Sequence, residues 1–232
     1  MTDIKNYGTF VKIEPINKGF SEDKKYYIET INGDKLLLRV SDISEYDRQK
    51  GRFEMLNRAA SAGVLTNTPV DFGVCDGGKS VYQLLKWLDG EEVRNVIPRL
   101  NESEQYILGI KSGELLKKIH TIPAPENAEP WGIRFRRKIK DNIDFYTAHD
   151  FKSPHAESII NYLQDNSSSL DSRPQTFIHG DFWVANLILN SSGEIGVIDF
   201  SYNDFNYGDP WNELSYTIPM EGTVFYSHYY TA

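Results

Sequence analysis

The spacing of apolar residues changes once along the 232-residue chain, from a strand pattern to a helical one. Most of the first 90 residues alternate apolar and polar side chains and are rich in β-branched and aromatic residues, which is typical of strands. Residues 43–62 are the exception, because their apolar positions recur at helical spacing until Gly63. The pattern therefore predicts a small sheet with one helix, followed by a helical region.

Individual elements follow from the same spacing. The expected strands of the first region are residues 9–16, 26–31, 35–40, 70–74 and 80–85. Two of them flank Asn32-Gly33, where both residues tolerate positive φ, so a two-residue hairpin turn is predicted. After Asp89-Gly90 the expected helices are residues 104–120, 134–146 and 154–166, and Ser167–Ser169 is expected to be a loop. Three short apolar runs follow, residues 176–178, 186–189 and 195–200, with the last two joined as a hairpin.

Charge and cysteine content exclude several classes of protein. The formal net charge is −8, and the 59 residues after Arg173 contain seven acidic residues and no Lys or Arg. A chain without a cationic surface is a poor ligand for phosphate backbones, so no nucleic-acid or membrane partner is expected. No apolar run approaches the roughly 20 residues that span a bilayer. With Cys75 as the only cysteine and no leader pattern, we expect a cytoplasmic protein.

One stretch near the C-terminus combines polar groups with short apolar runs. It reads His179-Gly-Asp181-Phe-Trp-Val-Ala-Asn186, and Asp199-Phe200 follows a predicted hairpin. Carboxylate and amide oxygens are the ligands that Mg²⁺ prefers, and the ion usually takes only one or two carboxylates. The remaining carboxylate is then available to orient a hydroxyl nucleophile. The stretch therefore predicts a magnesium site beside a catalytic acid or base.

The spacing of these residues is that of a kinase catalytic loop, with five residues from Asp181 to Asn186 and thirteen more to Asp199. Together with the segments HGDFWVANLIL, GVIDF and GDPWNEL, it resembles the aminoglycoside phosphotransferase family. This family comprises small-molecule relatives of protein kinases, related to choline and fructosamine kinases. The resemblance covers residues 11–214 and implies an α+β, two-lobed, protein-kinase-like fold. Residues 1–87 would form the nucleotide-binding lobe and residues 88–232 the catalytic and substrate lobe, shorter than is usual in the family.

The resemblance also implies roles in the second lobe. Asp181 would be the catalytic residue that accepts the hydroxyl proton, while Asn186 and Asp199 would hold Mg²⁺. His179 is expected to be a buried histidine that braces the catalytic loop, and Asp209 to bond the backbone amides of that loop. The residues expected to face the substrate are Asp204 and Glu213.

In the first lobe the resemblance implies a nucleotide site for ATP or GTP. Arg39 would reach the phosphates and Leu37 would cover the base. Backbone groups of Lys86 and Leu88 would pair with the purine edge, and Ser21 would donate to a phosphate.

One position departs from the family pattern. Kinases pair the strand cation with a helix glutamate, but the matching position here is Arg52. Glu54 and Glu45 are the alternatives, although a two-residue shift on a helix rotates a side chain by about 200°. The partner of Arg39 therefore stays open.

The expected function is Mg²⁺-dependent transfer of a γ-phosphoryl group to a hydroxyl of a small molecule. An aminoglycoside or similar amine-bearing compound is the favoured acceptor, because acidic clefts attract cations. A macrolide, choline or ethanolamine, a sugar or a fructosamine is the alternative. Two further classes stay open at this point: a nucleotide-binding pseudokinase without turnover, and a metal-dependent hydrolase using His179, Asp181 and Asp199. The oligomeric state is not indicated.

Overall fold

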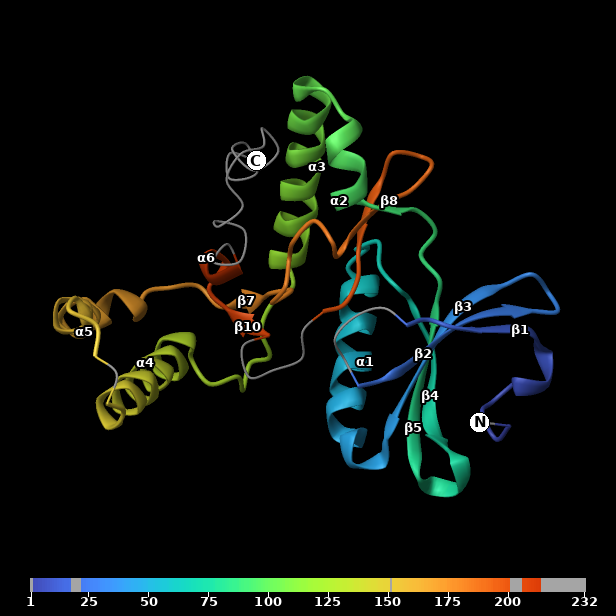
Figure 1. Cartoon of the computed structure of the whole chain (residues 1–232), viewed down its shortest axis with the longest axis horizontal. Coiled ribbons are helices and arrows are strands. Elements are labelled where there is room, and N and C mark those ends of the chain that lie inside the picture. The colour runs from blue at the N-terminus through green and yellow to red at the C-terminus, as the bar shows by residue number, and fades with distance from the viewer. Residues whose placement is uncertain (1, 18–21, 151, 201–205, 214–232) are drawn as a thin grey trace.

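A computed structural model describes residues 2–17, 22–150, 152–200 and 206–213 of the chain. Figure 1 shows two parts, a sheet with helix α1 and a second part that is mostly helical. Helix α1 lies on the side of the sheet that faces the second part (Figure 1). The order of these parts along the chain is the one that the change of apolar spacing predicts.

The first part is a five-stranded antiparallel sheet with the order β1-β2-β3-β5-β4. Its strands are β1 (Phe10–Pro15), β2 (Lys24–Thr30), β3 (Lys35–Asp42), β4 (Pro69–Cys75) and β5 (Ser80–Lys86). Short 3₁₀ helices flank them: η1 (Tyr7–Thr9), η2 (Ile43–Glu45) and η3 (Asp76–Gly78). One face of the sheet buries Ile28, Leu38 and Leu84 in a core cluster of its own. All five strands predicted from the sequence are present, with bounds shifted by a few residues.

The turn between β2 and β3 differs from the prediction. Only Gly33 has a positive φ, at 83°, so the two-residue turn predicted at Asn32-Gly33 is wrong. The Gly33 N–H donates to Thr30 O at 2.9 Å, and the Thr30 N–H donates to Asp34 O at 2.9 Å. Three residues thus close the hairpin, as in a loop whose last residue takes the left-handed conformation and forms a bulge.

Helix α1 (Tyr46–Ser61) is the only α-helix among the described residues before β5. The Asp42 side chain accepts from the Ser44 N–H and begins the short η2 turn ahead of α1. The helix ends at Ser61 with Ala62 as its C-cap, and Gly63 follows with a φ of 76°, a conformation that glycine adopts at little cost. Its buried residues Met55 and Leu56 face the core that joins the two parts.

The second part begins after Gly90. Its helices are α2 (Val93–Val96), α3 (Glu102–His120), α4 (Trp131–Ala148) and α5 (Ala156–Asp165), with 3₁₀ turns η4 (Ile97–Arg99) and η5 (Ser167–Leu170). The three long helices confirm those predicted from the apolar spacing. A capping box formed by Asn101 and Glu104 starts α3. Helix α2 was not predicted because four residues are too short to show a helical period. The predicted loop at 167–169 is the 3₁₀ turn η5.

Short strands carry the polar loops of the second part. They are β6 (Glu91–Glu92), β7 (Thr176–Phe177), β8 (Leu187–Leu189), β9 (Ile195–Val197) and β10 (Tyr207–Gly208), followed by helix α6 (Pro210–Glu213). Strands β8 and β9 form the predicted hairpin, and β6 pairs with β8 as a third strand. Strand β7 pairs with β10. These pairings bring the segments around residues 180, 198 and 209 together.

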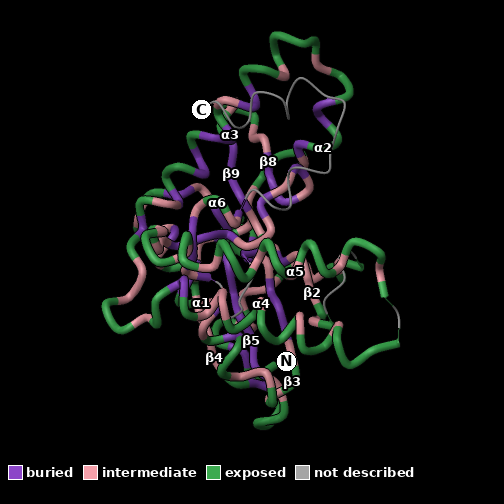
Figure 2. The backbone as a smooth tube through the Cα atoms, turned by 90° about the vertical axis from the view of Figure 1, so that its left-hand side faces the viewer, coloured by how far each residue is buried: buried purple, intermediate pink, exposed green. Residues whose placement is uncertain are grey.

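One apolar core crosses between the two parts. Met55, Leu56 and Leu85 of the first part belong to the same buried cluster as Ile119 and Phe177 of the second. Figure 2 shows buried backbone running from the sheet strands into β8, β9 and α3. The boundary predicted at residue 87 stays a prediction, since this core continues past it. Of the helices in the described ranges, none combines the length and apolar character needed to cross a bilayer.

Candidate active site

The loop between β7 and β8 is built around a buried histidine. His179 is fully buried, and its Nε2 donates to Ile198 O at 2.9 Å while its Nδ1 accepts from the Asp181 N–H at 3.2 Å. Burial lowers the pKa of His179, which favours the neutral ring that these two contacts require. Both ring nitrogens are thus committed to the protein, and neither is available to a metal ion. This contact pattern disfavours the metal-hydrolase alternative.

Asp181 and Asn186 face each other across this loop. The Asn186 Nδ2 donates to Asp181 Oδ2 at 2.8 Å and to Asp181 O at 2.9 Å. Burial raises the pKa of Asp181 above that of an ordinary carboxyl group. Because the amide nitrogen of Asn186 is turned toward Asp181, its amide oxygen points away and can meet another group. The two residues that the sequence spacing singled out are therefore in direct contact.

Asp199 is brought to the same place by the β8–β9 hairpin. The backbone N–H of Ile198 donates to Asn186 O at 2.9 Å, so Asp199 directly follows a residue bonded to Asn186. Its φ of 61° is unusual for a residue other than glycine, and its side chain is 46% exposed. Partial burial by itself would raise the pKa of Asp199, but the neighbouring Arg39 and Arg52 cations lower it more.

The oxygen donors of Asn186 and Asp199 fit a magnesium ion. Mg²⁺ binds oxygen ligands, uses few carboxylates from the protein and keeps positions for water and phosphate. Asp199 offers an accessible carboxylate and Asn186 an outward-turned amide oxygen, which are ligands of this kind. Across the described ranges, a separate group of side chains with the spacing to hold a metal ion is Asp3, Cys75 and Asp76, where β4 ends and η3 begins.

Two acidic residues have roles that differ from the sequence-based expectation. Glu213 was expected to face the substrate, but its side chain is fully buried and accepts from the backbone N–H groups of His179 and Gly180 at 2.5 and 2.8 Å. Asp209 was expected to bond those amides, but it accepts from Arg173 Nε and Nη2 and from the Trp211 N–H. Both expectations are wrong because the last residue of α6, Glu213, reaches the loop at His179 and Gly180, whereas Asp209, just before α6, does not.

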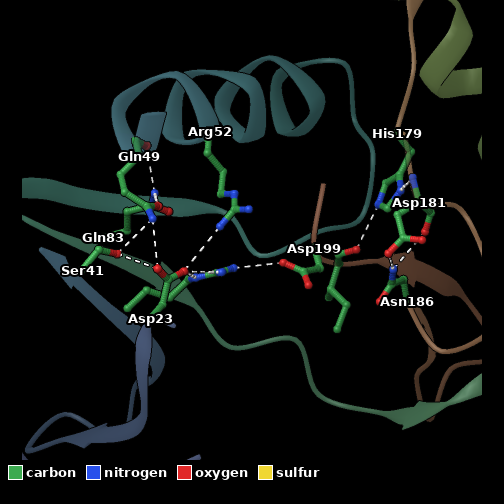
Figure 3. A network of polar contacts seen from close by, with 11 residues as sticks. Asp23, Ser41, Gln49, Arg52, Gln83, His179, Asp181, Asn186 and Asp199 are labelled. Atoms are coloured by element: carbon green, nitrogen blue, oxygen red, sulfur yellow. Dashed lines mark hydrogen bonds and ion pairs between the residues drawn. The ribbon is translucent and has the colours of Figure 1, made fainter. Parts of the chain in front are cut away.

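Arg39, the cation expected to bind phosphate, has a partner that the sequence analysis missed. Arg39 is 6% exposed and reaches Asp199 Oδ1 with Nη1 at 3.1 Å. Its Nη2 and Nε donate to Asp23 Oδ2 at 2.6 and 3.2 Å. Figure 3 shows the Asp23 carboxylate in one network with Gln49, Arg52 and, through Arg39, Asp199. Neither candidate glutamate takes part, since Glu54 is exposed and Glu45 pairs with Arg48.

The signal that finds Asp23 lies in the hairpin register. Lys25 pairs with Arg39 across β2 and β3. Side chains two residues apart on a strand share a face, so Asp23 falls beside Ser41 on the face that carries Arg39. A two-residue turn at Asn32-Gly33 would shift this pairing by one residue and place Asp23 on the opposite face.

The expected purine contacts are placed as follows. The Lys86 N–H donates to Thr68 O at 2.8 Å, and Lys86 O accepts from Asn67 Nδ2 at 3.0 Å. A purine contact through Lys86 is therefore restricted to the second lone pair of its carbonyl oxygen. Leu37 and Leu88 are half-buried, and Leu37 packs against the shared core. Ser21 and Asp204 lie outside the described residues.

Comparisons with known proteins agree with this geometry. A model of the phosphotransferase enzyme family matches residues 12–229. The ADP-bound aminoglycoside phosphotransferase APH(2'')-Ib superposes with a TM-score of 0.70 at 19% identity, over 96% of this chain and 77% of the other. The GDP and kanamycin complex of APH(2'')-IIia gives 0.63 at 17% identity, over 96% and 77%. The enzyme APH(3'')-Id from Streptomyces rimosus gives 0.58 at 14%, over 92% and 78%. No curated protein sequence matches the chain.

Proposed function

The chain belongs to the phosphotransferase enzyme family, and we propose that it transfers the γ-phosphoryl group of a nucleoside triphosphate to a hydroxyl group of a small, amine-bearing molecule. The family match and the shared fold confirm the resemblance, the kinase-like fold class and the phosphotransferase class expected from the sequence. The observation that carries the proposal is the direct contact of Asp181 with Asn186, with Asp199 held alongside by the Ile198–Asn186 hydrogen bond.

Asp181 supplies the group that handles the acceptor proton. Its carboxylate orients the acceptor hydroxyl and takes the proton as the hydroxyl oxygen bonds to the γ-phosphorus. The bond between that phosphorus and the bridging oxygen breaks, and a nucleoside diphosphate leaves. The Asn186 amide keeps the Asp181 carboxylate in one orientation during this step.

Asn186, Asp199 and Arg39 serve the nucleotide phosphates. Asn186 and Asp199 would hold a magnesium ion, which neutralises phosphate charge and aligns the γ-phosphoryl group when bound. Arg39 is expected to contact phosphate oxygens, for which its planar fork of donors is suited. Since proteins of similar fold bind ADP in one structure and GDP in another, ATP and GTP are both candidate donors.

The nature of the acceptor is inferred from relatives and charge. A protein of the same fold binds kanamycin, and the family resemblance adds other small molecules that carry hydroxyl groups. Burial of Glu213 removes one acid from the set available to attract a cation, which leaves Asp204 as the expected substrate-facing residue. A cytoplasmic location and the lack of nucleic-acid or membrane partners stay predictions from composition.

A panel of acceptors tests the proposal. The purified chain is incubated with Mg²⁺, ATP or GTP and one acceptor at a time, and release of ADP or GDP is measured. The acceptors are aminoglycosides, macrolides, choline, ethanolamine, sugars and fructosamines. The proposal expects release above the acceptor-free rate with at least one compound, favouring those with amines. Tight nucleotide binding without release from any compound would instead identify a pseudokinase.

A further inference from the structure

We propose that Asp23, the residue just before β2, is the positioning residue that orients Arg39 toward the nucleotide phosphates in place of a glutamate on helix α1. The inference rests on the proposed function, because it assigns a role within the same site. It concerns how the strand cation is fixed when the helix position carries Arg52.

The contact between Asp23 and Arg39 is a buried, two-donor ion pair. Arg39 Nη2 lies 2.6 Å and Nε 3.2 Å from the same oxygen, Oδ2, of Asp23. The two side chains are 10% and 7% exposed. Charge-assisted hydrogen bonds with little access to water are among the strongest polar contacts in proteins. The guanidinium plane of Arg39 is therefore set by Asp23, and its remaining Nη1 is directed to Asp199.

The other oxygen of Asp23 is anchored by neutral groups. Ser41 Oγ donates to Asp23 Oδ1 at 2.8 Å and Gln49 Nε2 at 3.1 Å. Gln49 is held in turn by Gln83 Nε2, which donates to the Gln49 side-chain and backbone oxygens at 2.7 and 2.8 Å. Figure 3 shows this chain of contacts from β5 through α1 to Asp23. Asp23 is thus fixed independently of Arg39, as an orienting group must be.

Helix α1 has no acidic residue placed to orient Arg39, because its acidic residues are exposed. Arg52, at the position expected for the helix glutamate, is 8% exposed and places Nη1 3.5 Å from Asp23 Oδ2. Burial, together with the nearby Arg39, lowers the pKa of Arg52 to about 10. Two buried cations therefore share one carboxylate, and without Asp23 they would repel each other. Among the described residues no partner is found for the Arg52 Nε atom.

Loss of the Asp23 charge has opposite effects on binding and on turnover. Removing a negative charge from the phosphate site leaves more net positive charge there, so nucleotide binding does not weaken. Arg39, however, is no longer held in one orientation, and positioning errors of about 1 Å can cost 10²-fold in rate. A residue with a merely structural role would lower both quantities together.

The variant Asp23→Asn separates these effects, with Asp23→Glu as the conservative replacement. Asp71→Asn is the matched control, because Asp71 is a partly buried carboxylate of the same sheet that pairs with Tyr82 and Lys5. Thermal unfolding checks the fold, calorimetry measures ADP binding with Mg²⁺, and release of nucleoside diphosphate measures kcat. We expect D23N to lower kcat by about 10²-fold with ADP affinity equal to or above wild type, while D23E and D71N stay within about fivefold in kcat. Equal losses of affinity and kcat in D23N, or no loss in kcat, would overturn the proposal.

A double-mutant cycle then asks whether Asp23 acts through Arg39. In an Arg39→Gln background the D23N change should cost less than about threefold in kcat, because its target is gone. A D23N cost that is the same in both backgrounds would refute positioning. If the wild type releases no nucleoside diphosphate with any acceptor, the proposed function fails. ADP binding still tests the positioning role of Asp23. D23N must then bind ADP at least as tightly as wild type, and a loss of ADP affinity in D23N as large as the loss in R39Q would overturn the inference.

Discussion

The Oε2 atom of Glu213 lies 2.5 Å from the backbone nitrogen of His179, 34 residues earlier in the chain. The same carboxylate accepts from the Gly180 N–H through Oε1 at 2.8 Å. Helix α6 thereby fixes the backbone immediately before Asp181, the proposed catalytic residue. His120, at the end of α3, places Nε2 3.9 Å from Glu213 Oε2, so the carboxylate also lies next to the core of the second part.

Replacing Glu213 with Gln should destabilise the fold and slow catalysis. A glutamine has one acceptor oxygen, so one of the two backbone N–H groups would face an NH₂ group in a fully buried position. An unsatisfied buried donor costs about 1–3 kcal/mol. Urea unfolding should show a loss of this size, together with a lower kcat. Glu54→Gln, at an exposed position, serves as the control. Stability within about 0.3 kcal/mol of wild type would contradict the assigned contact.

The variant Asp181→Asn tests the proton-accepting group. The amide keeps the shape of the side chain but cannot take the hydroxyl proton, so kcat should fall by roughly 10²–10⁴-fold. Nucleotide binding should change by less than about threefold, because Asp181 contacts Asn186 rather than Arg39. Steady-state kinetics and calorimetry with ADP measure the two effects separately. Turnover at the wild-type rate would exclude Asp181 from catalysis.

Asp199→Asn tests the expected magnesium site. Wild-type affinity for ADP should rise when Mg²⁺ is added, since Asn186 and Asp199 would hold the ion and the ion would offset phosphate charge. With D199N this rise should disappear, while affinity measured in EDTA stays near wild type or improves because Arg39 loses a competing carboxylate. Titrations with and without metal supply the comparison. An unchanged response to Mg²⁺ would place the metal elsewhere.

The buried ring of His179 predicts a pH dependence of stability. Its folded-state pKa is lowered by burial, so below about pH 6.5 the unfolded chain takes up a proton that the folded ring does not. The free energy of unfolding therefore falls as the pH drops below about 6.5, and the ring has no such effect above that pH. The difference in unfolding free energy between wild type and His179→Gln should shift against wild type by up to about 1.4 kcal/mol per pH unit. Urea unfolding from pH 7.5 to 5.5 measures this, and a pH-independent difference would disprove it.

The proposed catalytic and metal-binding positions were predicted from their spacing and from the family resemblance. Asp181, Asn186 and Asp199 lie in one short stretch, and the β8–β9 hairpin between them leaves few ways to arrange them. The same locality made the sheet and the long helices predictable. Residues acting over long sequence distances were harder, because contacts between distant segments leave no period in the sequence. Asp209 and Glu213 are four residues apart, and only the direction of α6 decides which of them reaches the catalytic loop.

The strand-then-helix pattern, together with the segments HGDFWVANLIL, GVIDF and GDPWNEL, was sufficient to predict a kinase-like phosphotransferase fold with a carboxylate-rich site. The tertiary structure decided how the charges are paired. Asp23 and Arg39 are 16 residues apart, and Arg39 and Asp199 are 160 residues apart. The physical reason is that an ion pair depends on the distance and burial of its groups, and both are set by hairpin register and by the packing of one part of the chain on the other.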